Sequence, residues 1–195
     1  MDIIQAKEML NEDLPFQVTL DTADRIIKEL DLSKNARILD VGTGAGNMAA
    51  TLALNGYSVI TGEPEDDESL YSKKDWAGKA EKLQVDHLIT FRAFNAENMP
   101  FEKGMFDAVF LFGCFHHMPE AVRTDAINEC LRVTTPAGIL CLFEPTETMV
   151  KLIRKSDPDH PDAADPGKYT AGMNVSTEIK TGDLFTAYIL RKQQP

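Results

Sequence analysis

The sequence predicts an α/β fold with a doubly wound, mostly parallel sheet, and two observations carry this prediction. Residues 38–47 begin with a short apolar run that ends in an acid, and glycine then stands at every second position. Such a run is typical of a buried central strand, and the apolar stretch after it indicates a helix. Strand-like and helix-like stretches then alternate along the chain, as they do where helices join parallel strands.

The first 35 residues precede this strand and carry two helical patterns. Apolar residues from Ile3 to Met9 mark one face, and those from Ala23 to Leu30 mark another. Asp21 or Thr22 is suited to cap the second helix. We expect plain packing of these helices, most simply on the sheet edge, with a place at the mouth of a ligand cleft as the alternative.

The glycine loop predicts a nucleotide-like ligand. Gly42, Gly44 and Gly46 lack a Cβ, so the backbone can turn sharply and approach a ligand closely. The helix that begins after them aims N–H groups at a polar group. A dinucleotide fingerprint needs the glycine order G-x-G-x-x-G, and Asn47 stands where its third glycine would be. The spacing therefore disfavours a nicotinamide-dependent enzyme.

The second predicted strand, residues 57–61, ends just before Glu63. Ligands of open α/β sheets bind past the carboxyl ends of parallel strands, so Glu63 is a candidate ligand contact. Its alternative is a solvated member of the acidic run 63–68. A helical pattern over 70–83 follows, and residues 88–94 alternate like a third strand.

The later part of the chain continues the sheet. Residues 106–112 read as a fourth strand that is buried on both faces. Residues 136–138, Pro-Ala-Gly, predict a turn into a fifth strand over 139–143. Two strand-like stretches, 169–179 and 184–190, predict a closing antiparallel hairpin.

Two adjacent histidines, His116 and His117, follow the fourth predicted strand. Such a pair can act as a base or bind a metal ion. Consecutive side chains seldom converge on one ion, so we expect a structural or helix-capping role and no metal site. The three cysteines have no C-x-x-C spacing, which disfavours zinc binding and a disulfide framework.

From Asp40 to Gly46 the chain reads D-x-G-x-G-x-G, which resembles the first motif of class I S-adenosylmethionine-dependent methyltransferases, especially the quinone and sterol methylating group. Residues 95–101, Asn-Ala-Glu-Asn-Met-Pro-Phe, resemble a later motif of that family, in which aspartate usually stands where this chain has Asn95. The likeness covers about residues 36–195. It implies a Rossmann-like methyltransferase fold with a seven-stranded sheet, a C-terminal antiparallel hairpin and S-adenosylmethionine as cofactor.

The resemblance also implies which residues bind the cofactor. Glu63 would accept hydrogen bonds from the ribose hydroxyls, and Asn95 would accept one from the adenine amino group without an aspartate's charge. Phe112 could place its ring near the sulfonium cation, although a core role is commoner. The expected cofactor contacts are Asp40, Gly42, Thr43, Gly44, Gly46, Glu63, Asn95, Ala96 and Phe112.

The reaction that the resemblance implies is an in-line methyl transfer to a small molecule. It requires chiefly that reactants are aligned and water is excluded, so no side chain is assigned a catalytic role. Cofactor binding without catalysis is the alternative, and an NAD(P)-dependent enzyme is a less favoured one.

Composition limits the partners. The formal charge of −11, from 31 acidic and 20 basic residues, repels phosphate backbones, so DNA and RNA are not expected partners. The longest apolar run is too short to cross a bilayer, and the cysteine usage suits a reducing cytoplasm. We expect one domain over 1–195, with a helical cap over 1–35 and a core over 36–195. The oligomeric state stays open.

Residues 156–168 are rich in aspartate and proline and should not form a regular helix. We expect an irregular segment that is mobile without substrate. A lid over the cleft and a solvated surface connection both fit this composition.

Overall fold

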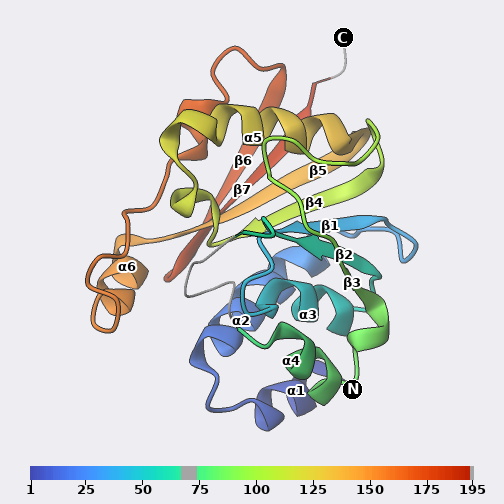
Figure 1. Cartoon of the computed structure of the whole chain (residues 1–195), viewed down its shortest axis with the longest axis vertical. Coiled ribbons are helices and arrows are strands. Elements are labelled where there is room, and N and C mark those ends of the chain that lie inside the picture. The colour runs from blue at the N-terminus through green and yellow to red at the C-terminus, as the bar shows by residue number, and fades with distance from the viewer. Residues whose placement is uncertain (67–73, 194–195) are drawn as a thin grey trace. The chain divides into compact units, whose positions relative to one another are not determined.

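A computed structural model of the chain describes residues 1–66 and 74–193 (Figure 1). Their strands form a seven-stranded sheet in the order β3-β2-β1-β4-β5-β7-β6. The predicted α/β fold, a mostly parallel sheet with an antiparallel C-terminal hairpin, is therefore confirmed. By compactness the chain divides into two units, Met1–Asn95 and Ala96–Pro195.

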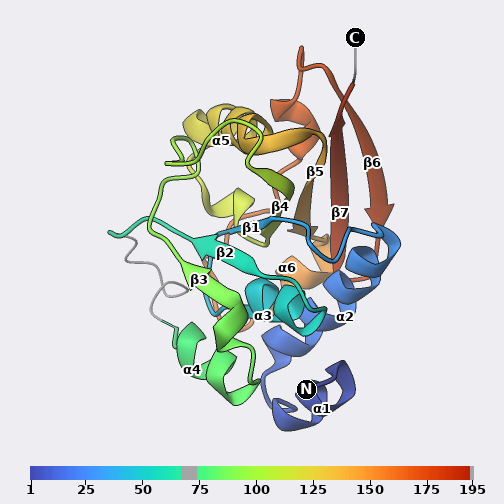
Figure 2. The same cartoon turned by 90° about the vertical axis from the view of Figure 1, so that its right-hand side faces the viewer.

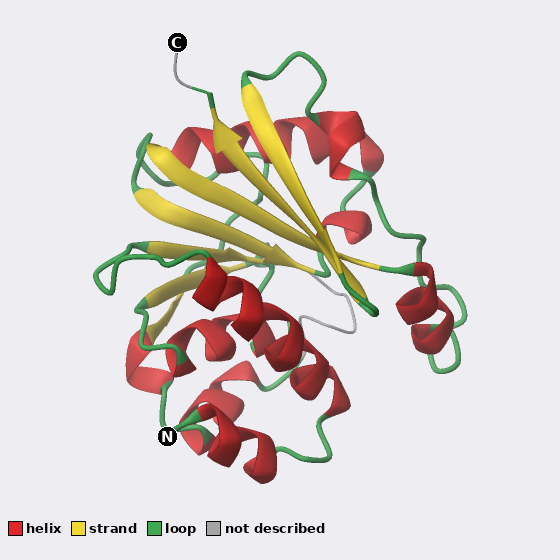
Figure 3. Cartoon of the chain, turned by 180° about the vertical axis from the view of Figure 1, so that it is seen from behind, coloured by secondary structure: helices red, strands yellow, loops and turns green. Residues whose placement is uncertain are grey.

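The first unit combines three parallel strands with helices that lie on one side of them (Figures 1 and 3). Its apolar core joins Ala6, Phe16, Leu20 and Ala50, which come from three different helices. The elements are α1 (Ile3–Met9), α2 (Leu14–Glu29), β1 (Ile38–Val41), α3 (Asn47–Leu54), β2 (Val59–Gly62), α4 (Trp76–Lys82), η1 (Asp86–Leu88) and β3 (Ile89–Phe91).

The second helix differs from the prediction. It begins at Leu14 and is capped by Asp13, whose side chain accepts a hydrogen bond from the backbone N–H of Phe16. Asp21 and Thr22 lie inside the helix, so their predicted capping role is wrong. Pro15 is tolerated in the first turn of this helix, because an N–H there has no intrahelical partner to lose. The helix therefore includes Pro15, whereas the sequence pattern suggested a start after it.

Two further elements of the first unit are shorter than predicted. Helix α4 covers only the second half of the predicted 70–83 segment. Leu70 and Tyr71, like Glu68 of the acidic run, lie outside the described residues. Strand β3 has three residues, because the 3-10 helix η1 includes Leu88 and the strand already ends at Phe91, before residues 92–94.

The second unit contains a parallel strand pair followed by an antiparallel hairpin. Strands β4 and β5 are parallel, and β7 lies between β5 and β6 (Figure 2). The central residues of β4 are almost fully buried, as the sequence predicts for a strand covered on both faces. The elements are β4 (Phe106–Phe112), η2 (Phe115–His117), α5 (Glu120–Val133), β5 (Thr134–Pro145), α6 (Glu147–Ile153), η3 (Pro166–Tyr169), β6 (Val175–Thr181) and β7 (Phe185–Lys192).

Strand β5 begins earlier than predicted, because the expected turn at 136–138 is a bulge within the strand. Phe106 pairs with Thr134, whereas Ala108 pairs with Ile139, so the register shifts between these two pairs. The shift leaves Pro136 exposed and outside the regular ladder, where its missing N–H costs no hydrogen bond.

The hairpin also starts later than predicted. Residues 169–174 are not in a strand, because η3 ends at Tyr169 and β6 begins at Val175. Among the helices of the described residues, none has both the length and the apolar character of a membrane span. The three cysteines, all in the described part of the chain, form no disulfide.

Candidate functional site

The loop after β1 has a backbone that only glycine adopts easily. The φ angles of Gly42, Gly44 and Gly46 are 90°, 48° and 73°, which lie in the left-handed region. A Cβ on Gly46 would also lie 2.8 Å from the Cβ of Trp76. These three glycines therefore build a turn that a residue with a side chain would disrupt, as the sequence predicts.

The loop is tied to the end of β2. The backbone N–H of Gly44 donates a hydrogen bond of 2.7 Å to Oε2 of Glu63, and the N–H of Gly42 donates to the carbonyl oxygen of Gly62 at 2.8 Å. The structure thus brings Glu63 onto the glycine loop, 19 residues apart along the chain. The solvated role that the acidic run allowed does not describe this carboxylate.

Asp40 is fully buried beneath the loop. The hydroxyl of Thr61 donates to Oδ2 of Asp40 at 2.8 Å, and the hydroxyls of Thr43 and Thr61 are 2.9 Å apart. Since the single proton of Thr61 goes to Asp40, Thr43 donates to Thr61. The hydroxyl of Thr43 is therefore already hydrogen-bonded to Thr61. Any ligand contact of this residue would be made by its backbone.

The second oxygen of Asp40, Oδ1, is buried and has no hydrogen-bond partner in the described part of the protein. Burial raises the pKa of Asp40 from 3.8 to about 7, the hydrogen bond from Thr61 opposes this rise, and the charge of Glu63 adds to it. An orphaned buried acceptor costs free energy, so this position is suited to a donor that arrives from outside the protein.

The expected adenine contact lies at an exposed position. Asn95 is exposed and lines a hollow with Glu65, Asp66, Ala93 and Phe94. This hollow belongs wholly to the first unit. A polar amide beside an open hollow can offer both donors and acceptors to a planar base.

The remaining two predicted contacts, Ala96 and Phe112, belong to the second unit. Ala96 is buried, and the ring of Phe112 packs against Phe143 and Phe185, at centroid distances of 5.0 and 4.6 Å. Phe112 itself is half-buried at the end of β4. The structure gives Phe112 no role that requires a ligand.

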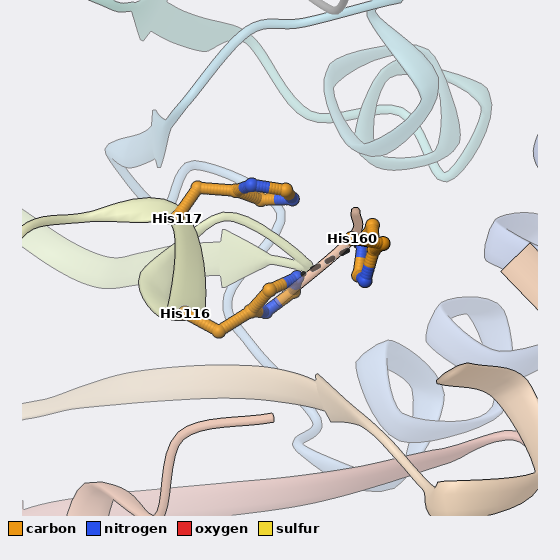
Figure 4. A group of neighbouring side chains, drawn as sticks. All are labelled: His116, His117 and His160. Carbon is orange, nitrogen blue, oxygen red and sulfur yellow. Dashed lines mark hydrogen bonds between the residues drawn. The ribbon is translucent and has the colours of Figure 1, made fainter. Parts of the chain in front are cut away.

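A second polar cluster, within the second unit, was not predicted as a whole. His116 and His117 in η2 lie beside His160, which comes from the irregular segment after α6 (Figure 4). Nδ1 of His116 is 3.0 Å from Oε2 of Glu144, and both residues are almost fully buried. In the sequence, only His116 and His117 stand next to each other. A histidine inside an otherwise Asp- and Pro-rich segment was the signal that could have pointed to the third member.

The segment 156–168 is irregular, as predicted, but it is anchored at several points. His160 is buried, and its carbonyl oxygen accepts hydrogen bonds from Nε and Nη2 of Arg154 at 2.8 and 2.7 Å. Oε2 of Glu144 accepts a third bond from the backbone N–H of Ala164 at 2.8 Å. These bonds hold the segment to the second unit and do not suit the loose lid that its composition allowed.

The sequence matches a family model described as a methyltransferase domain over residues 39–142. Among curated proteins, the chain is 31% identical over 126 residues to a 27-O-demethylrifamycin SV methyltransferase of Amycolatopsis mediterranei, with 65% of this chain and 44% of that protein covered. The chain spans about half the length of the curated relatives it matches.

Solved structures share the fold. The PH0226 protein of Pyrococcus horikoshii has a TM-score of 0.70 at 16% identity, over 92% of each chain. The [4+2]-cyclase SpnF is 27% identical with a TM-score of 0.51, over 63% of this chain and 45% of that one. Fold, glycine loop and family match agree, and this chain belongs to the methyltransferase domain family. The family resemblance read from the sequence is confirmed.

Proposed function

We propose that this protein transfers a methyl group from S-adenosylmethionine to a small-molecule acceptor. One observation carries the proposal: the glycine loop after β1 and the carboxylate of Glu63 after β2 meet, with Gly44 N–H 2.7 Å from Oε2. The loop lets a polar group of a ligand approach the backbone closely, and the carboxylate next to it can accept hydrogen bonds from a diol. A nucleoside ligand requires both features side by side.

The residues present suit this cofactor. Glu63 would bind the ribose diol, and the exposed amide of Asn95 would contact the adenine in the hollow that it lines. Oδ1 of Asp40 would be satisfied by a donor that enters with the ligand, an ammonium group or a water molecule. Gly42, Thr43, Gly44 and Gly46 would contribute backbone groups.

When bound, the cofactor supplies the sulfonium methyl group. The protein's own contribution would be to bind and orient the two reactants and to exclude water from them. This requires no side chain to change its covalent state. Glu63 would hold the nucleoside in place, while the glycines let it lie against the backbone. Ala96 and Phe112 stay predicted contacts, and the packing of the Phe112 ring against Phe143 and Phe185 favours an indirect role.

A small acceptor follows from the relatives and from the charge. The rifamycin relative is named for a small-molecule substrate, and a formal charge of −11 disfavours nucleic acid. We also propose one functional domain over 1–195 and a cytoplasmic location, which the absence of disulfides among the three cysteines supports.

A second candidate function is ligand binding without methyl transfer. The 27% identity to the SpnF cyclase favours it, because that protein of the same fold is named for a different reaction. The binding residues would serve both functions, so the binding site alone does not distinguish them.

Calorimetry tests the binding part of the proposal. We expect S-adenosylhomocysteine to bind and NAD to give no signal. Glu63→Ala should weaken S-adenosylhomocysteine binding by roughly 1 to 3 kcal/mol, because buried hydrogen bonds to the ribose are lost. The matched control is Glu81→Ala, which removes an exposed acid from α4 of the same unit. Tight NAD binding without a response to S-adenosylhomocysteine would refute the proposal.

Transfer is tested with cofactor that carries an isotope-labelled methyl group. The protein is incubated with a metabolite extract, and products are searched by mass spectrometry for the mass of one labelled methyl group. A labelled metabolite that is absent with Glu63→Ala supports methyl transfer. Cofactor binding with no labelled product supports the second candidate instead.

A further inference from the structure

Three of the four histidines of the chain gather in the second unit. His116 and His117 extend from η2 towards His160, and one nitrogen of each lies within 4.8 Å of those of the other two (Figure 4). His116 and His160 are buried, and His117 is exposed. The cluster therefore has two fixed members and one that borders solvent.

The hydrogen-bond partners decide which nitrogen of each buried ring carries the hydrogen. Nδ1 of His160 is 2.9 Å from the carbonyl oxygen of Pro161, which can only accept, so the hydrogen is on this Nδ1. Nδ1 of His116 lies 3.1 and 3.0 Å from the two oxygens of Glu144, which accept as a carboxylate. In the neutral rings, both Nε2 atoms are consequently lone-pair acceptors.

These two acceptors face each other, with Nε2 of His116 3.4 Å from Nε2 of His160. Two lone pairs at this distance repel unless a positively charged species lies between them. A shared proton would satisfy the pair alone. A metal ion would satisfy the pair and also explain the third histidine.

The spacing agrees with a metal ion. Zinc–nitrogen bonds of about 2.0 to 2.1 Å in a tetrahedral site place two ligand nitrogens about 3.3 Å apart. The His116–His160 distance of 3.4 Å matches this value. Other nitrogens of the cluster are up to 4.8 Å apart, so a side chain must rotate slightly to bring all three within reach of one ion. The exposed ring of His117 can rotate more easily than its buried neighbours.

The surrounding groups have the arrangement usual for histidine ligands of metal ions. Such a histidine donates its other N–H to a carboxylate or a backbone carbonyl, as His116 and His160 do here. Arginines hold both backbones: Arg123 donates to the carbonyl oxygen of His116, and Arg154 to that of His160. Glu144 provides a buried negative charge next to the cluster.

We propose that His116, His117 and His160 bind a divalent transition-metal ion of the zinc class, with a fourth coordination position open to water or to a substrate heteroatom. Imidazole nitrogens suit zinc, iron, nickel and copper, whereas magnesium and calcium prefer oxygen. This departs from the sequence-based expectation that no metal is bound. It does not rest on the proposed methyl transfer, because the ligands and their partners all belong to the second unit.

Metal binding is tested on the untagged full chain after treatment with a chelator and without S-adenosylmethionine. Zn²⁺ is titrated in by calorimetry, and Co²⁺ by its visible absorption, which reports coordination geometry. We expect one ion per chain. Glu144→Gln should weaken binding by about 10- to 100-fold, through the loss of its hold on His116. His116→Ala and His160→Ala each remove a ligand and should weaken binding more than Glu144→Gln does. The loss in His117→Ala should be smaller than in these two variants.

The chain contains its own control. His87 is the fourth histidine and is exposed in η1 of the first unit, so His87→Ala should leave metal binding unchanged. His160→Cys should still bind Co²⁺ and should show a sulfur-to-cobalt charge-transfer band. Such a band would prove that the side chain at position 160 is a direct ligand of the ion. S-adenosylhomocysteine binding and thermal unfolding of each variant identify those that fail to fold.

Two results overturn the proposal. One is a wild-type protein that takes up neither Zn²⁺ nor Co²⁺ in stoichiometric amount, which leaves a shared proton as the species between the rings. The other is equal loss of binding in His87→Ala and the folded cluster variants, which would indicate adsorption of the ion at surface histidines. Neither result bears on methyl transfer, which the labelled-cofactor experiment tests separately.

Discussion

Asp40 and Glu144 are two buried carboxylates near the ends of two strands, and they differ in how many of their oxygens are hydrogen-bonded. Asp40 in β1 has one hydrogen bond, from Thr61, and its second oxygen has no partner among the described residues. Glu144 in β5 is hydrogen-bonded through both oxygens to His116 and also accepts from Ala164. One carboxylate retains an unused acceptor, and the other joins two distant segments.

The two regions around these acids also differ in what builds them. Around Asp40, the loop from Gly42 to Gly46 is shaped by backbone angles and close approach. Around Glu144, the contacts come from the imidazole of His116 in η2 and from the backbone N–H of Ala164 in the segment after α6. We therefore expect an added Cβ to damage the first region most, and a changed functional group to damage the second.

The largest effect should come from Gly62→Ala, at the end of β2. A Cβ there would lie 1.9 Å from the carbonyl oxygen of Arg92, a backbone atom that cannot move aside easily. We expect a loss of more than about 4 kcal/mol in the free energy of unfolding, or failure to fold, because overpacking against backbone is not relieved by rotamers. Urea unfolding measures it.

Gly56→Ala is the matched control for that experiment. Its φ of +89° is positive, whereas that of Gly62 is not, and no atom of the described residues lies within 4 Å of the added Cβ. We expect a cost of only about 1 to 2 kcal/mol from the backbone angle. A loss in Gly62→Ala no larger than that in Gly56→Ala would contradict the large cost expected from close approach at Gly62.

The next effect concerns Asp40→Asn and depends on pH. Between pH 3.8 and about 7, folded Asp40 keeps a proton that the unfolded chain has released, so its contribution to stability falls as pH rises through this window. Asparagine removes the titration. At pH 8 the variant should be more stable than wild type by on the order of 4 kcal/mol, and at pH 4 this gain should vanish.

Urea unfolding at both pH values checks this prediction, with Asp86→Asn as the exposed control in the same unit. The same variant should bind S-adenosylhomocysteine less tightly if the orphaned oxygen serves the ligand. A gain in stability that does not change with pH would contradict the raised pKa.

Glu144→Gln should act in the opposite direction. An amide has one acceptor oxygen in place of two, so one of the donors from His116 and Ala164 is left unsatisfied in a buried position. We expect a loss of about 2 kcal/mol in the free energy of unfolding, measured without metal ions. Glu147→Gln, at a side chain that is 91% exposed, is the control and should change stability little.

The smallest effect should be a gain. Asn95→Asp restores the charge that the related motif usually has, and a charged acceptor binds an amino group more strongly. We expect S-adenosylhomocysteine to bind about 2- to 5-fold more tightly, which calorimetry can resolve. Asn98→Asp adds the same charge at another exposed position and should have no effect. An equal gain in both variants would assign the change to net charge.

The sequence by itself predicted the glycine loop and identified Glu63 as a candidate ligand contact. Gly42 to Gly46 and Glu63 are recognisable because a loop built by backbone angles needs glycine at particular positions, and the acid follows the next strand directly. Strand β4 was also found with its observed bounds, since a doubly buried strand is a continuous apolar run. The start of β5 was missed because the bulge at Pro136 depends on pairing with β4.

The tertiary structure alone decided how polar groups meet across long separations. His116 and His160 are 44 residues apart, and Glu144 is 28 residues from His116. A local sequence pattern does not predict these contacts, because they depend on the path of the chain through α6 and the segment after it. The environment of Asp40 was hidden for the same reason: its sequence neighbours indicate a buried strand, but only the folded chain shows that one of its oxygens has no donor among the described residues.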